Sequence, residues 1–295
     1  MEKDLQAYLE YLVESKHLAA NTLASYHRDL DQYLNYLKAC HIVDLESVQK
    51  IHVQQYLRLL HEKKRATSSI MRMLSSIKNF HLYLQLQQKT THNPASTIEM
   101  AKLAPKVPTY LTVSEVNHLL QQPDITTHKG IRDRAILELL YATGLKVSEC
   151  IALKVQEVHT DLAYLEYQAK GKKIRVLPLG SECVKWLQMY LTKSRKVFAK
   201  NQEEQVLFLT QQGKAFTRQG LWKNMKQYVL QAGLKKEVTP QTLRHSLAIH
   251  LLENGADLAS VQELLGHVDL STTQMYVQAT KKRLSESYQQ YFPRA

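Results

Sequence analysis

The stretch TPQTLRHSLAIHLLENGADLASVQELLGHVDLSTTQMYVQ spans residues 239–278 and carries its own helix boundaries. Thr239 can cap a helix start, and Pro240 fits the first helical position, where no N–H is needed. Two later helix starts are marked by the capping residues Asp257 and Ser271. Two helix ends are marked by Gly255 and Gly266. These signals predict three consecutive helices, over residues 240–253, 258–265 and 272–277.

Four side chains in this stretch can act together on a phosphate. Gln241 and Arg244 are three residues apart on one predicted helix and share a face. His267 and Tyr276 follow in the same stretch. Phosphoryl transfer from DNA to a tyrosine needs cations on the phosphate, a nucleophile and a proton donor. With 16 tyrosines and 13 histidines in the chain, spacing alone leaves this function open.

Two lysines upstream can add positive charge. Lys146 opens a predicted helix just after Gly144, and Lys170 lies in the tight basic turn AKGK, residues 169–172. That turn joins two segments with strand-like alternation, Leu162–Tyr167 and Lys173–Leu179. Basic side chains at such a turn are usually only solvated. A capping box at residues 112–115 and helical periodicity predict further helices, which include residues 130–141, 182–198 and 218–232.

The first 129 residues contain no glycine, and the segment before residue 88 is predicted to consist of helices only. Apolar residues recur at helical spacing in four runs, Leu5–Leu12, Leu23–Leu37, Val53–Leu60 and Ile70–Leu84. Four amphipathic helices with short connections predict a small bundle. The polar, proline-containing stretch 88–108 predicts a linker between a domain at residues 1–87 and a second at residues 109–295.

A net charge of +12, from 39 basic and 27 acidic residues, favours a polyanionic partner, nucleic acid before a membrane surface. Residues 1–62 carry 6 basic and 9 acidic side chains, whereas residues 63–106 carry 8 basic and 1 acidic. We therefore expect phosphate contacts from four basic side chains in this region, Lys63, Lys64, Arg65 and Arg72. Short polar side chains are expected on the same helix face, Ser75, Ser76 and Asn79. The alternative is a helix face that is merely solvated.

Several classes of protein are excluded by what the sequence lacks. No apolar run reaches the roughly 18 residues that span a bilayer, and the charged start MEKDLQAYLE is unlike a signal peptide. Three scattered cysteines argue against a disulfide framework or a cysteine zinc site, and for a reducing compartment. No phosphate-binding glycine loop is present. We therefore expect a cytoplasmic protein that uses no metal and no cofactor.

Several segments resemble the tyrosine recombinases of the phage integrase family, of the XerC/XerD type. LLYATGLKVSECIALK (139–154) is similar to the family's first arginine motif, and residues 239–278 are similar to its second conserved block. AKGKKIRVLPLG (169–180) resembles the family's strand hairpin. LAANTLASYHRDLDQYLNYL near the N-terminus resembles its core-binding domain, and the ending YFPRA is most similar to XerD-like chains. The resemblance covers essentially the whole chain.

The resemblance implies a mainly α fold with a small β-hairpin, in which a four-helix core-binding domain and a catalytic domain form a C-shaped clamp on duplex DNA. It implies strand cleavage through a 3′-phosphotyrosyl bond, without ATP or metal. Tyr276 matches the nucleophile, Arg244 the second arginine of the phosphate clamp, and His267 the second histidine. Lys170 matches the general acid for the leaving 5′-oxygen, and the neighbouring Lys172 and Lys173 are expected to contact DNA.

Two positions depart from the family pattern. The family has arginine where Lys146 stands and histidine where Gln241 stands. Lysine offers a point charge instead of a planar fork, and glutamine cannot exchange a proton near neutral pH. On a helix, His245 is expected to point about 100° away from Arg244, so it is not a substitute for that histidine. Three interpretations stay open: a recombinase that has drifted and works slowly, a DNA-binding descendant that has lost most cleavage, or deliberate substitutions.

The resemblance also implies partners. Four protomers, identical or shared with a paralogous recombinase, would assemble on two recombination sites, and a DNA translocase of the FtsK type would activate them. The implied task is the resolution of chromosome dimers. A C-terminal tail, residues 281–295, would dock on a neighbouring protomer, or else pack on its own domain. The rival function is a non-catalytic DNA-binding or architectural protein.

Overall fold

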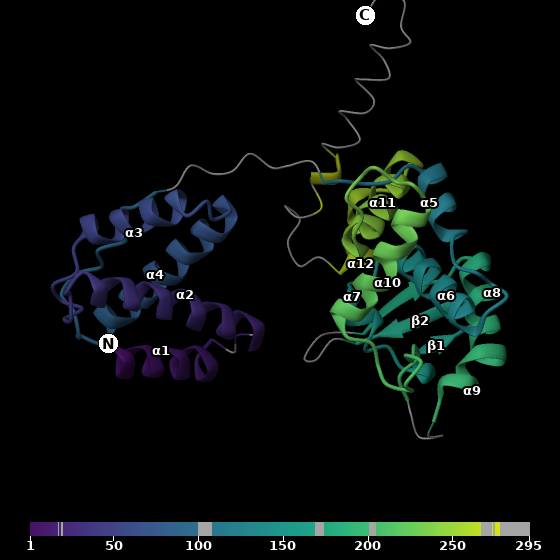
Figure 1. The fold of residues 1–295 in the computed structure, drawn as a ribbon, viewed down its shortest axis with the longest axis horizontal. Helices are drawn as coiled ribbons and strands as arrows, with labels where there is room; N and C mark the ends of the chain where they lie inside the picture. The colour runs from purple at the N-terminus through teal and green to yellow at the C-terminus, as the bar shows by residue number, and fades with distance from the viewer. Residues whose placement is uncertain are drawn as a thin grey trace, which may run out of the picture. The chain divides into compact units, whose positions relative to one another are not determined.

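The computed structural model describes residues 1–16, 18, 20–99, 108–168, 174–200, 205–266, 273 and 275–277. The chain divides into two compact units, Met1–Ala104 and Pro105–Ala295, which are described separately (Figure 1). The domain boundary predicted at residue 87 therefore lies inside the first unit.

The first unit contains the four predicted helices, α1 Glu2–Glu14, α2 Ala20–Ala39, α3 Lys50–Glu62 and α4 Thr67–Leu86. Helix α4 packs against each of the other three. Its apolar stripe, which includes Ile70, Ile77 and Phe80, is fully buried. Aromatic rings join the helices, since the Tyr8 ring centroid lies 5.4 Å from that of Phe80. The periodicity of the sequence thus predicts this bundle correctly.

Part of the predicted linker packs on this bundle. Ala95 and Ile98 are buried in the core of the first unit. The backbone N–H and hydroxyl of Thr91 donate to the Glu46 carboxylate, at 2.8 and 2.5 Å. Residues 89–98 are therefore held to the bundle by their own contacts, which a reading of composition alone does not reveal.

The second unit is mostly helical around one small sheet. Its helices are α5 Val113–Leu120, α6 His128–Thr143, α7 Val147–Cys150, α8 Ser181–Met189, α9 Arg195–Phe198, α10 Arg218–Gln231, α11 Pro240–Glu253 and α12 Leu258–Leu265. A 3-10 turn covers Val155–Glu157, and a π-helical turn at Tyr190–Ser194 joins α8 to α9. The helices predicted over residues 240–253 and 258–265 are confirmed at both ends.

The sheet is antiparallel with strand order β1-β2-β3, formed by Val158–His159, Tyr164–Tyr167 and Arg175–Pro178. The predicted hairpin corresponds to β2 and β3, in which Leu165 pairs with Leu177. Strand β1 was not predicted, because two residues are too few to show an alternation. The basic turn at residues 169–173 lies outside the described residues.

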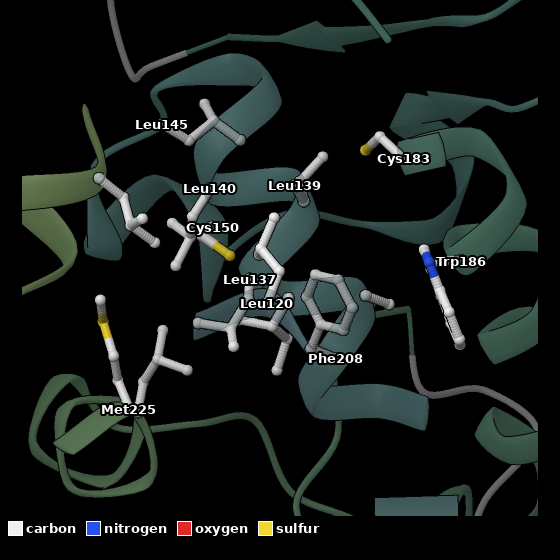
Figure 2. Packing of buried hydrophobic residues seen from close by; sticks show 14 of the residues in the cluster. Leu120, Leu137, Leu139, Leu140, Leu145, Cys150, Cys183, Trp186, Phe208 and Met225 are labelled. Atoms are coloured by element: carbon white, nitrogen blue, oxygen red, sulfur yellow. The ribbon is translucent and has the colours of Figure 1, made fainter. Parts of the chain in front are cut away.

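Helix α6 is the centre of the second unit and packs against α5, α8, α11 and β3. It is buried around most of its circumference, and Figure 2 shows Leu139 and Leu140 among side chains from other elements, including Trp186 and Phe208. The helix ends at Gly144, whose φ of +60° is unfavourable for any residue with a side chain. A Cβ there would lie 2.7 Å from the Leu265 side chain, so glycine lets α12 approach this turn.

The cysteines form no disulfide, and Cys150 and Cys183 are buried. Burial raises the pKa of the Cys150 thiol to about 12, so this thiol is not reactive at neutral pH. Across the described residues, no helix is both long and apolar enough to cross a membrane.

Candidate active site

Helix α11 is the platform of the candidate site. The Thr239 hydroxyl accepts from the backbone N–H of Thr242 at 3.3 Å, and Pro240 is the first helical residue, as predicted. Gln241, Arg244 and His245 therefore lie in the first two turns of a helix whose start is fixed. The rest of α11 is anchored by buried apolar residues.

Arg244 is almost completely buried, at 1% exposure, and joins two helix ends. Its guanidinium donates to the carbonyl oxygen of Gly144, at the end of α6, and to that of Leu265, at the end of α12, the latter at 2.7 Å. Carbonyls at helix C-termini carry partial negative charge and suit a cation. Burial lowers the pKa of Arg244, which Glu149 and Tyr276 oppose, but arginine stays charged in proteins.

Two further charged residues complete this network, and sequence reasoning did not select them. Arg175 on β3 donates to the Leu265 carbonyl at 2.7 Å and to the Glu149 carboxylate at 3.2 Å. Glu149 also accepts from the backbone N–H of Lys146 at 2.9 Å, at the start of α7. One sign was available in the sequence, because Arg175 lies two residues before the inward-facing Leu177, on the same side of the strand, and so is a charge on the buried side.

Tyr276 is fully buried, and its hydroxyl meets the α11 side chains. The ring belongs to an apolar cluster with Leu247, Ala248 and Leu265. Its hydroxyl lies 2.9 Å from Nδ1 of His245. Burial raises the pKa of Tyr276, whereas the charge of Arg244 and a hydrogen bond from it act in the opposite direction. The structure thus brings together Tyr276 and Arg244, which are 32 positions apart in the sequence.

His245 diverges from Arg244 as expected, but it still contacts Tyr276, which the sequence did not predict. A helix turns about 100° per residue, so Arg244 and His245 do diverge, but Tyr276 lies where both can reach its hydroxyl. Burial, and then the charge of Arg244, lower the pKa of His245 to about 4. His245 is therefore a neutral imidazole at physiological pH. His250, one turn further along, bonds the Tyr141 hydroxyl instead, at 2.8 Å.

Lys146 and Gln241 are both exposed. Lys146 lies two residues after Gly144, which accepts from Arg244, and its backbone is held by Glu149. Gln241 lies one turn before Arg244 on α11. Four predicted site residues lie outside the described residues, His267, Lys170, Lys172 and Lys173, as does the C-terminal tail.

The predicted DNA-contacting residues of the first unit divide into two groups. Lys63, Lys64 and Arg65 are all exposed at the turn between α3 and α4. Arg72 is 44% exposed and forms an ion pair with the buried Asp29. Ser76 is buried and donates to the same carboxylate at 3.3 Å, so the prediction that Ser76 lies on the open polar face is wrong. A serine facing a buried carboxylate satisfies that charge, which explains its position.

Comparison with known proteins agrees with this fold. Residues 109–283 match the phage integrase family, and residues 5–88 match the phage integrase N-terminal SAM-like domain. A protein named tyrosine recombinase XerD from Staphylococcus haemolyticus (strain JCSC1435) is 41% identical over 295 residues, and another of that name from Oceanobacillus iheyensis is 42% identical over 297 residues. Both alignments cover 100% of this chain and 100% of the relative.

Solved structures show the same fold. A XerH site-specific recombinase bound to its difH substrate in a pre-cleavage complex has a TM-score of 0.74 at 22% identity, over 96% of this chain and 82% of that chain. A λ integrase dimer bound to a core site has a TM-score of 0.72 at 17% identity, over 94% of each chain.

The matched families and relatives, together with a mainly helical unit around a small sheet, identify the class of DNA strand-transfer enzymes that use tyrosine. The chain belongs to the phage integrase family, and within it to the Xer-type site-specific tyrosine recombinases. The resemblance read from the sequence motifs is thereby confirmed, and the rival reading as a non-catalytic descendant is not favoured.

Proposed function

We propose that this recombinase cuts one DNA strand by attack of the Tyr276 oxygen on the scissile phosphorus, forming a 3′-phosphotyrosyl bond. The observation that carries this proposal is the contact of the Tyr276 hydroxyl with His245, beside the buried Arg244. A fixed cation beside the tyrosine allows its oxygen to be positioned in line with a phosphate that the same cation neutralises.

The other site residues take complementary roles in this proposal. Arg244 and Lys146 neutralise the non-bridging phosphate oxygens, and Gln241 donates a hydrogen bond to the phosphate. His267 is expected to hydrogen-bond the same phosphate, and Lys170 to protonate the leaving 5′-oxygen. The phosphotyrosyl bond keeps the energy of the broken linkage, so a 5′-hydroxyl of the partner strand reverses the step without ATP.

The burial of Tyr276 adds a requirement. Its ring is fully buried in the absence of DNA. The oxygen can therefore meet a phosphorus atom only after a local rearrangement when DNA binds. This requirement protects the nucleophile until the substrate is present.

A nicked duplex carrying the recombination site tests the proposal, because the short cleaved end diffuses away and the covalent complex accumulates. The bound sequence is first mapped by footprinting. We expect a protein–DNA adduct that survives denaturation. Tight binding of the mapped site without any adduct would support the DNA-binding descendant instead.

Replacing Lys146 with arginine is expected to raise the single-turnover rate of adduct formation. Arginine donates two parallel hydrogen bonds to a phosphate, whereas lysine donates from a point. One preorganised donor is worth about 10²–10³ in rate, so we expect a gain of about 10-fold or more. Lys154→Arg serves as the control. It makes the same change at another exposed lysine, which is not a predicted site residue. An unchanged rate in Lys146→Arg would show that Lys146 does not contact the phosphate.

We also propose that both units grip the DNA as a clamp, the first through the exposed turn between α3 and α4. Changing Lys63, Lys64 and Arg65 together to glutamine is expected to weaken binding and to make it less sensitive to salt. Each lost phosphate contact lowers the slope of log affinity against log salt by about 0.9. Removing the same charge at Lys3, Lys16 and Lys50, measured by the same titration, is the control. Equal slopes for the two triple variants would contradict the clamp.

The assembly and the task follow from the family. We infer that four protomers, identical or mixed with a paralogous recombinase, act on two sites, and that a DNA translocase of the FtsK type regulates them. We propose that this assembly resolves chromosome dimers before cell division, in the cytoplasm. Reconstitution with and without such a translocase measures this regulation.

A further inference from the structure

We propose that His245 accepts the proton of the Tyr276 hydroxyl as this oxygen attacks DNA. The proposal rests on the proposed function, because it concerns the same cleavage step. It assigns a catalytic role to a residue that follows the buried arginine in the sequence and touches the reacting oxygen.

The proposal takes the Tyr276 hydroxyl as the donor of the hydrogen bond between the two side chains. Nδ1 of His245 lies 2.9 Å from the Tyr276 hydroxyl oxygen. Arg244 also hydrogen-bonds this oxygen, and a guanidinium can only donate. We therefore assign the one proton of the hydroxyl to the bond with Nδ1 of His245, which requires the tautomer that carries its own proton on Nε2.

The site provides a need for such an acceptor. A phenol is a weak nucleophile until it loses its proton, and burial raises the pKa of Tyr276 further. Gln241, one turn before Arg244, cannot take up a proton. His245 is the titratable side chain of α11 that touches the hydroxyl, since His250 on the same helix bonds Tyr141.

The surroundings of His245 keep it ready to accept. Burial and the adjacent Arg244 hold the imidazole neutral in the free protein. Within the described residues, α5, α6 and α12 pack against α11, and no charged group on them contributes to the lowered pKa of His245. A bound phosphate would bring negative charge to Arg244 and Tyr276, which stabilises the imidazolium that forms during attack.

The step balances as follows. The O–H bond of Tyr276 breaks and its proton moves to Nδ1 of His245, while the freed oxygen forms a bond to phosphorus. The bond from phosphorus to the 5′-oxygen breaks, and that oxygen takes a proton from the general acid proposed above, Lys170. In the reverse step His245 returns its proton to the tyrosine oxygen.

The variant His245→Asn tests this role. The asparagine oxygen takes the place of Nδ1 and still accepts a hydrogen bond, but it cannot be protonated. We expect adduct formation to slow by about 10²-fold, as loss of a general base does, with unchanged affinity for the site. His250→Asn is the matched control, because His250 lies on the same helix as His245 and forms a similar hydrogen bond with the Tyr141 hydroxyl, and it should cleave at the wild-type rate. A wild-type rate in His245→Asn would overturn the proposal.

A second measurement separates proton transfer from positioning. A fluorinated tyrosine, introduced at position 276 alone by stop-codon suppression, is more acidic and depends less on a base. We expect it to restore most of the rate lost in His245→Asn, and no rescue would mean that His245 only orients the ring. A substrate with sulfur in place of the 5′-oxygen needs no general acid, so it should not rescue His245→Asn, and full rescue by sulfur would also contradict a role as base.

The wild-type chain distinguishes failure of the proposed function from failure of the role of His245. If the wild type forms no adduct with the mapped site, the proposed function fails before His245 is tested. If the wild type forms adduct and His245→Asn fails to fold, as thermal unfolding would show, His245→Gln carries the same comparison with the fluorinated tyrosine.

Discussion

Replacing Tyr276 with phenylalanine is expected to abolish the covalent protein–DNA adduct while DNA binding stays at the wild-type level. The substitution removes one oxygen and keeps the buried ring within its apolar cluster. Without that oxygen no bond to phosphorus can form, so the loss is complete and not merely large. Losing the bond to the partly buried His245 should lower the free energy of unfolding by about 0.5–1.5 kcal/mol.

Denaturing gels of the nicked substrate measure the adduct, and urea unfolding measures the stability. Tyr141→Phe is the matched control, because the Tyr141 hydroxyl bonds His250 at 2.8 Å in the same unit. It should lose a similar amount of stability and keep its adduct. A persistent adduct in Tyr276→Phe would assign the nucleophile to another residue and would remove the basis of the proposed function.

Arg244→Ala is expected to reduce the rate of cleavage by about 10³-fold or more and also to destabilise the second unit. The guanidinium both faces the tyrosine oxygen and joins the ends of α6 and α12. Removing it leaves the buried Gly144 carbonyl without this donor, at a cost of about 1–3 kcal/mol, while Leu265 keeps its bond from Arg175. The catalytic loss comes from the missing charge on the phosphate.

Arg195→Ala separates these two effects. Arg195 also joins two carbonyls, of Leu207 at 3.1 Å and of Val206 at 2.7 Å, but it takes no part in the candidate site. We expect it to lower the melting temperature as Arg244→Ala does and to leave the rate of adduct formation near that of the wild type. A similar loss of rate in both variants would mean that Arg244 acts only through stability.

The sequence predicts the helices well because their ends are marked by local chemistry. Thr239 with Pro240, Asp257 and the glycines at 144 and 266 act within one turn of where they stand, so no tertiary information is needed. Strand β1 is different, since two residues become a strand only by pairing with β2. The packing of residues 89–98 on the first unit depends likewise on a distant partner, Glu46.

The candidate site shows the same division. Tyr276 and Arg244 can be chosen from the motif, because the family resemblance names both. His245 cannot, since its part depends on where the Tyr276 ring lies across α11. Arg175 and Glu149 form an ion pair at 3.2 Å between a strand and a short helix, and neither residue belongs to the stretch that carries the tyrosine. Contacts between distant helices and strands decide these roles, and the spacing of residues along the sequence does not predict such contacts.

The carbonyl of Leu265 receives both Arg175 and Arg244. One peptide group at the end of α12 therefore holds the guanidinium of Arg175 on β3 and that of Arg244 on α11. A small shift of α12, pulled by a neighbour bound to its exposed side, would drag both guanidinium groups at once. Such a shift would let a partner protomer slow strand cleavage without contacting either the DNA or the tyrosine.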